Sequence, residues 1–306
     1  MPLQLRSVVS DGLRVAVSRN GAVFAAVFLA VETLSLLLVL VAGTTYVPVD
    51  LGAGIDPTGG IAAGSQLSEL TGAAAMLLVG AFSAVVTVPV SIIAIRTFVA
   101  GATDAIPEAA LFNDLGWATA RGLVATLCYT GLLFLLPVAA GLGLLAILFG
   151  LGASGLSGWI AGVVGLLSGG LLLAILLAVG VVVWLHFLFL LHEIGVREQG
   201  VVDAFRGSWA TVRGSRLEVG VLALLLTSLR TGVGWFSAPP VDGAWTLLPA
   251  IATLVSLVGS AAIGVVTVAI LARAYRDLRP EVDPDGPSGR AEPADADSPQ
   301  GEPNPQ

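Results

Sequence analysis

The stretch at residues 200–214, GVVDAFRGSWATVRG, is the strongest amphipathic segment in a chain that is otherwise mostly apolar. Its large apolar residues recur at helical spacing and form one stripe: Val202, Phe205, Trp209 and Val212. Asp203 lies in the first turn and Arg213 in the last, where the helix dipole favours each charge, and Gly214 is placed to end the helix in a left-handed conformation. Because apolar runs stand on both sides, we expect this helix to lie flat on a membrane surface with Trp209 at headgroup depth.

The composition predicts a polytopic membrane protein. Of the 306 residues 56% are hydrophobic and only 11% are charged, and the mean hydropathy is +0.93, so a soluble fold could not hide the apolar surface. The single cysteine, Cys128, excludes an intrachain disulfide, and we expect it to be buried in its apolar run. The net charge of −7 comes mostly from residues 281–306, so we do not expect nucleic acid as a partner.

Six apolar runs flank the amphipathic segment, and each is long enough to cross a bilayer of about 30 Å. They cover residues 22–42, 72–95, 122–151, 159–191, 217–236 and 245–272. The expected fold is an all-α polytopic helix bundle with six transmembrane helices and interfacial amphipathic helices. The expected domains are a cytoplasmic amphipathic segment at 1–21, a six-span membrane domain at 22–275, and a disordered, acidic, Pro-rich cytoplasmic tail at 276–306.

The distribution of arginine predicts the orientation. All 14 basic residues are arginines, and 13 of them fall in segments that lie on one side of a six-span arrangement. The positive-inside rule therefore puts the N- and C-termini in the cytoplasm of a multi-pass protein of the cell membrane. The remaining arginine, Arg230, falls inside the fifth run.

Two hexapeptides predict an internal repeat. Residues 117–122 read WATARG and residues 209–214 read WATVRG, so they match at five of six positions, and each precedes an outgoing run. Duplication of an interfacial helix followed by a membrane hairpin explains the match. The alternative is that any helix next to a membrane favours an aromatic residue and an arginine at headgroup depth, and the residues leave both explanations open.

The region around the second hexapeptide resembles a known family. The pattern Glu198-Gln199-Gly200, then Asp203-Ala204-Phe205-Arg206, Ser208-Trp209 and Arg213-Gly214-Ser215-Arg216, is similar to one in uncharacterised multi-span membrane proteins of haloarchaea. Residues 96–123, with Ile106-Pro107 and Leu115-Gly116-Trp117-Ala118-Thr119, resemble the same family's first cytoplasmic loop. That family is itself similar to the membrane domain of some bacterial glycerophosphoryl diester phosphodiesterases. Those relatives carry catalysis in a separate soluble domain, so the resemblance implies membrane architecture and no diesterase activity.

Glu32 and Arg230 are the charged residues that the apolar runs contain near mid-depth. An ionised side chain there costs a few kcal/mol unless it has a partner. Glu32 lies 13 residues after Arg19 and Arg230 lies 14 after Arg216, so their depths are similar and we predict an intramembrane polar pair. Hydroxyl groups occur nearby, at Thr33, Ser35, Thr227 and Ser228. The pair suits either a polar site for an ion, proton or headgroup, or a structural contact that fixes helix register.

A second set of residues is placed to meet lipid headgroups at the interface: Trp117, Arg121, Arg206, Trp209, Arg213 and Arg216. His186, His192 and Glu193 have the wrong spacing for a helical metal site, so we expect them to be interfacial polar residues. We find no motif for a nucleophile, a metal or a phosphate loop, and we predict no catalytic, cofactor-binding or metal site.

Two small-residue ridges allow close helix packing, which serves a homo-oligomer or the bundle itself. They comprise Ala161, Gly165 and Gly169 in one run and Ser256, Ser260 and Gly264 in another. The favoured interpretation is a non-enzymatic membrane protein that interacts with lipids or acts as a scaffold or accessory protein. The alternative is a small transporter or permease that uses the polar site of Glu32 and Arg230. A permease should have a hydrated cavity that reaches Glu32, whereas a structural protein should not.

Overall fold

The structure is a computed structural model that describes residues 3–46, 63–153, 155, 158–236 and 247–279. Within these ranges the chain is helical and contains no strand. The helices are α1 (Leu5–Ala16), α2 (Arg19–Tyr46), α3 (Ala63–Val99), α4 (Glu108–Phe112), α5 (Leu115–Ala153), α6 (Gly158–His186), α7 (Leu190–Arg197), α8 (Val201–Arg213), α9 (Arg216–Phe236) and α10 (Leu247–Leu278).

Five helical segments are long and apolar enough to cross a membrane, which supports a membrane protein. They are Arg19–Val41, Leu77–Val99, Leu115–Ala153, Gly158–Arg197 and Ile251–Leu278. The helix α9, which corresponds to the fifth predicted span, is not among them. It has 21 residues and carries Arg216, Glu218 and Arg230. The sixth crossing therefore stays a prediction.

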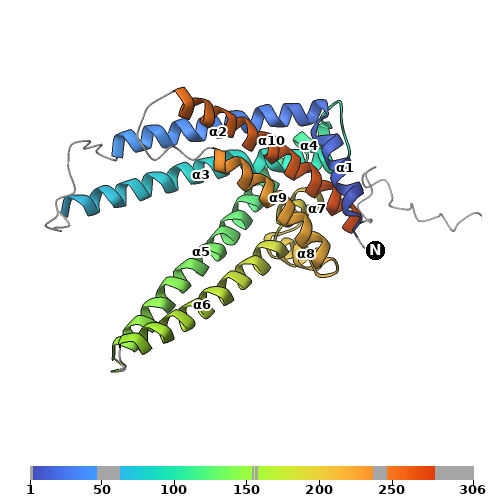
Figure 1. The fold of residues 1–306 in the computed structure, drawn as a ribbon. Coiled ribbons are helices and arrows are strands. Elements are labelled where there is room, and N and C mark those ends of the chain that lie inside the picture. Colours follow the sequence, from blue (N-terminus) through green and yellow to red (C-terminus); the bar gives the residue numbers. More distant parts are fainter. Residues whose placement is uncertain (1–2, 47–62, 154, 156–157, 237–246, 280–306) are drawn as a thin grey trace, which may run out of the picture.

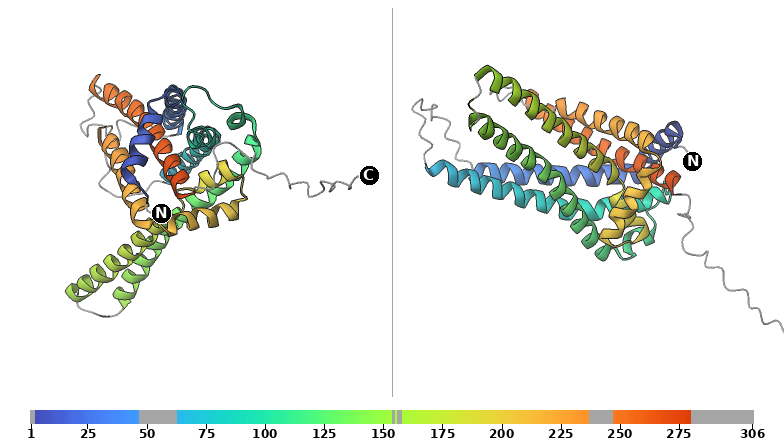
Figure 2. Two further views of the ribbon diagram at one scale, coloured as in Figure 1. Left: turned by 90° about the vertical axis from the view of Figure 1, so that its right-hand side faces the viewer. Right: turned by 90° about the horizontal axis from the view of Figure 1, so that it is seen from below.

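The long helices form two groups that share one end (Figure 1). The helices α2, α3, α9 and α10 run together in one group, while the α5–α6 hairpin diverges from them. The short helices α1, α4, α7 and α8 gather where the two groups meet, and Figure 2 shows the same arrangement from two other sides. The C-terminal end of α10 also lies there.

The most tightly packed part of the protein is this shared end. Phe98, Phe189 and Tyr275 are completely buried there, and Phe24 meets Phe98 edge to face with their ring centroids 5.3 Å apart. The helix α1 lies close against α10, because a Cβ atom on Gly12 would stand only 2.7 Å from the Cα atom of Ile270. The distal halves of the long helices instead expose many leucines and valines, as expected for surfaces that face lipid.

The structure corrects several details of the sequence interpretation. Cys128 is exposed on α5, so its predicted burial was wrong. The fourth apolar run is interrupted, because α6 ends at His186 and α7 begins at Leu190. Gly214 follows α8 as predicted, but its φ of −82° is right-handed, and the left-handed residue in this region is Glu198 with a φ of 54°.

The two hexapeptides lie in different local structures. Residues 117–122 fall within the first turns of the long helix α5, whereas residues 209–214 close the separate helix α8. Four residues form the buried face of α8, and all except Val212 are small or carry a hydroxyl group: Ala204, Ser208, Thr211 and Val212. Of the predicted apolar stripe, Val202 and Trp209 are 62% and 39% exposed. Small residues allow α8 to approach its neighbours closely, while Val202 points outward and Phe205 packs against Phe187 with ring centroids 4.8 Å apart.

Candidate functional site

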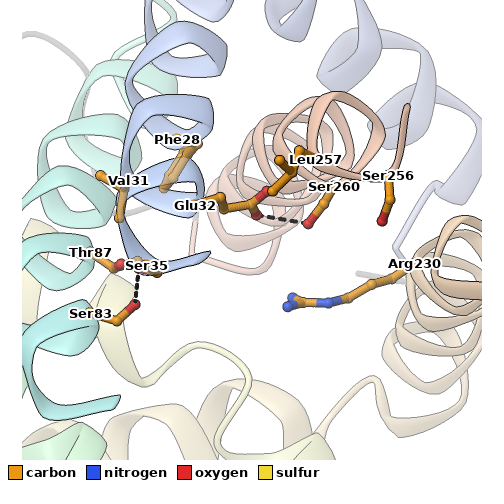
Figure 3. A pocket seen from close by; sticks show the side chains of 10 residues that line it. All are labelled: Phe28, Val31, Glu32, Ser35, Ser83, Thr87, Arg230, Ser256, Leu257 and Ser260. Carbon is orange, nitrogen blue, oxygen red and sulfur yellow. Dashed lines mark hydrogen bonds between the residues drawn. The ribbon is translucent and has the colours of Figure 1, made fainter. Parts of the chain in front are cut away.

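A polar cavity of about 440 Å³ lies between α2, α3, α9 and α10 (Figure 3). Seven of its ten lining residues are polar: Glu32, Ser35, Ser83, Thr87, Arg230, Ser256 and Ser260. The remaining three are Phe28, Val31 and Leu257. Two consecutive pairs of helices, α2 with α3 and α9 with α10, thus place their polar side chains around one space, although the helices are otherwise mostly apolar.

Glu32 is only partly satisfied in this cavity. It projects from the middle of α2, and the Ser260 hydroxyl on α10 donates a hydrogen bond of 2.7 Å to its Oε1 atom. Its Oε2 atom is buried and has no hydrogen-bond partner among the described residues. A buried carboxylate oxygen without a donor is costly, so this atom is where an additional donor would be most favourable.

Arg230 reaches the same cavity from α9. Figure 3 shows its side chain extending toward the space that separates it from Glu32 and Ser260. The ion pairs among the described residues do not include one between Glu32 and Arg230. The two predicted residues are therefore brought to one cavity, and each presents its charge to the space between them.

The hydroxyl groups around the cavity were predicted only in part. Ser35 lines it, as its position next to Glu32 suggested, and its hydroxyl donates to that of Ser83 on α3 at 3.3 Å. Thr33 and Thr227 instead donate to carbonyl groups of their own helices. Ser256 and Ser260 had been assigned to a packing ridge, and their four-residue spacing was the available signal for a hydroxyl-bearing face.

A second polar cluster, at the shared end, was not predicted. Glu193 on α7 is completely buried, so its assignment to the interface was wrong. Its Oε1 atom accepts hydrogen bonds from the Thr211 hydroxyl at 3.0 Å and from Arg279 Nη2 at 3.2 Å. Arg197 Nη1 lies 3.8 Å from its Oε2 atom. Arg279 also donates to the Gly207 carbonyl, so this Glu193 network joins α7, α8 and the end of α10.

A family model for a domain of unknown function, DUF7847, matches residues 3–278. The chain belongs to the DUF7847 family. No significant match was found among proteins of curated function or among solved structures. All residues that line the cavity lie within the DUF7847 domain, and Arg279 directly follows it. The haloarchaeal origin and the likeness to phosphodiesterase membrane domains are not shown by these comparisons and stay predictions.

The residues predicted to meet lipid headgroups differ in how far other protein groups already engage them. Arg121 stacks over the Trp117 ring at 5.3 Å and donates to the Glu198 carbonyl at 2.6 Å, so protein groups already engage it. Arg206 is exposed and pairs loosely with exposed Asp203 at 3.5 Å. Arg213 and Arg216 are also exposed, as is part of Trp209.

The histidines of the DUF7847 domain serve packing in this structure. His186 and His192 are both buried, which corrects their expected interfacial exposure. The His186 ring stacks on Trp209 at 4.0 Å, and His192 packs against Tyr275 with ring centroids 5.4 Å apart. Within the described ranges no group of three or more histidine, cysteine or acidic residues is arranged to hold a metal ion.

Proposed function

We propose that this chain is a membrane protein that binds a small polar solute in the cavity between α2, α3, α9 and α10, as a transporter or permease does. The observation that carries the proposal is the buried Oε2 atom of Glu32, which lacks a hydrogen-bond partner and borders a cavity that Arg230 also reaches. In a purely structural pair the arginine would contact the buried carboxylate, since close contact with a cation offsets the cost of burying it. Arg230 instead stays exposed, and the ion pairs among the described residues do not join it to Glu32.

The size of the cavity also supports a solute. A volume of about 440 Å³ lies within the usual range of about 300–1,000 Å³ for small-molecule sites. It equals roughly 15 water molecules at about 30 Å³ each in the liquid. Its polar walls favour water or a polar solute over a lipid chain, because hydrocarbon would offer no donor to Oε2 of Glu32 and no acceptor to Arg230.

Cysteine labelling tests whether the cavity holds water. Cys128 is the only cysteine, so a Cys128→Ser protein gives a clean background for single cysteines. Ser35→Cys should react with a water-soluble methanethiosulfonate reagent about tenfold faster than Thr33→Cys, because a thiol needs water to ionise. Thr33 is the matched control, since it lies on α2 at nearly the same depth but is exposed on the outer surface and does not line the cavity.

Equal labelling of the two cysteines would refute the proposal. If Ser35→Cys reacts faster, uptake of labelled solutes into proteoliposomes, with Glu32→Gln as the inactive comparison, then tests whether binding leads to transport. Ser256→Cys on α10 provides a second position on the cavity wall, in case the substitution at Ser35 disturbs folding.

A role in binding lipid, as a scaffold or accessory protein, is the second candidate. It is favoured by the exposed Arg206, Arg213 and Arg216 together with the partly exposed ring of Trp209. These groups suit anionic headgroups at the end where the short helices gather. Both candidates are non-enzymatic, and both include α9 as a sixth crossing, a location in the cell membrane and cytoplasmic termini.

A further inference from the structure

The cavity carries two opposite charges on different walls, and this arrangement limits what it can bind. Glu32 comes from α2 and is held at Oε1 by Ser260, while Arg230 comes from α9 and faces the same space (Figure 3). A simple cation would pair with Glu32 and leave Arg230 without a partner, and a simple anion would do the reverse. A single ligand that carries both charges satisfies both groups at once.

From this arrangement we infer that the cavity binds a small zwitterion, with its ammonium group at Glu32 and its carboxylate or phosphate at Arg230. This inference rests on the proposed function and names its substrate class. An ammonium group supplies the donor that Oε2 of Glu32 lacks. A guanidinium group holds a carboxylate or phosphate through two parallel hydrogen bonds.

The other walls fit the middle of such a molecule. The hydroxyl groups of Ser35 and Ser83 already form a hydrogen bond of 3.3 Å with each other. They therefore make a polar wall that needs no charged group on the ligand. Phe28 and Leu257 add apolar surface that suits a short methylene linker. The same chemistry occurs in a free amino acid and in the ethanolamine phosphate headgroup of a lipid.

Protection of Ser35→Cys from labelling measures occupancy. The protein is held in nanodiscs of phosphatidylglycerol. Three zwitterions, namely glycine, β-alanine and γ-aminobutyrate, are then compared with methylammonium and acetate at equal ionic strength. At least one zwitterion should protect at a concentration about tenfold lower than either single ion, since it makes two charged contacts where a single ion makes one. Nanodiscs that contain phosphatidylethanolamine and no added solute form the lipid arm, and protection in that arm identifies a headgroup as the ligand.

Charge-neutral variants test the assigned ends. Glu32→Gln should abolish the advantage of the zwitterion and leave acetate as the better probe, whereas Arg230→Gln should leave methylammonium as the better probe. Arg14→Gln is the control, because Arg14 is an exposed arginine that does not line the cavity. Arg230→Lys keeps the charge and should retain part of the advantage, which covers the case in which Arg230→Gln does not fold.

The two possible failures are distinct. If Ser35→Cys labels rapidly but no zwitterion, free or in lipid, protects better than the single ions, the inference is wrong and a hydrated solute site remains. If Ser35→Cys labels no faster than Thr33→Cys, the proposed function fails and the inference fails with it.

Discussion

Loss of Arg279 should destabilise the protein strongly, because Arg279 neutralises the buried Glu193. We consider Arg279→Met, which keeps an unbranched apolar stem in place of the arginine stem and removes all of its donors. In the intact protein Arg279 donates to Glu193 Oε1 at 3.2 Å, to the Thr211 hydroxyl at 2.9 Å and to the Gly207 carbonyl at 3.1 Å. The variant therefore leaves a completely buried carboxylate without its nearest cation.

The magnitude follows from the burial and from the groups that remain. Removing one partner of a buried ion pair costs about 3–5 kcal/mol. Here Thr211 still donates to Glu193, Arg197 stays 3.8 Å away, and the Arg279 side chain is itself 24% exposed. These residual contacts lower the expected loss to about 2–3 kcal/mol of unfolding free energy.

The assay is equilibrium unfolding in mixed micelles with increasing dodecyl sulfate, followed by tryptophan fluorescence. Arg206→Met is the matched control, because Arg206 pairs with Asp203 at the surface, where the two side chains are 78% and 68% exposed. Such a pair contributes about 0–1 kcal/mol. Adding Glu193→Gln to Arg279→Met should recover about 1–3 kcal/mol relative to the sum of the single changes.

An Arg279→Met protein that is no less stable than Arg206→Met would refute the reasoning. So would strict additivity in the double variant, because it would mean that Glu193 and Arg279 contribute to stability independently.

Two further changes test the helix packing and the second candidate function. Gly12→Ala should cost about 1–3 kcal/mol, because its Cβ would stand 2.7 Å from the Ile270 backbone, whereas Gly80→Ala has open space and should not destabilise the protein in the same unfolding assay. Neutralising Arg206, Arg213 and Arg216, the exposed arginines of α8 and of the start of α9, should lower the amount of phosphatidylglycerol that copurifies, measured by mass spectrometry against the wild-type protein. Unchanged lipid content would remove the support for headgroup binding there.

The sequence determined the helices themselves. Long apolar runs leave the backbone no partner in lipid except itself, so the runs predicted helices, and five apolar helical segments suitable for crossing were found. The amphipathic stretch predicted α8 to within one residue at each end. The depth of Glu32 and Arg230 along their runs indicated one polar centre, and both residues line the same cavity.

Only the tertiary structure decided which faces meet. Ser260 bonds to Glu32 across 228 residues of sequence, and Arg279 reaches Glu193 across 86. Cys128 was expected to be buried within the protein, but it is exposed on the surface of α5. The physical reason is that lipid and the protein interior are both apolar, so the periodic contrast that reveals the buried face of a soluble helix is absent here. Polar residues still indicate which face of a helix is turned to the protein. Their partners lie on other helices, however, so the contacts can be identified only in the packed structure.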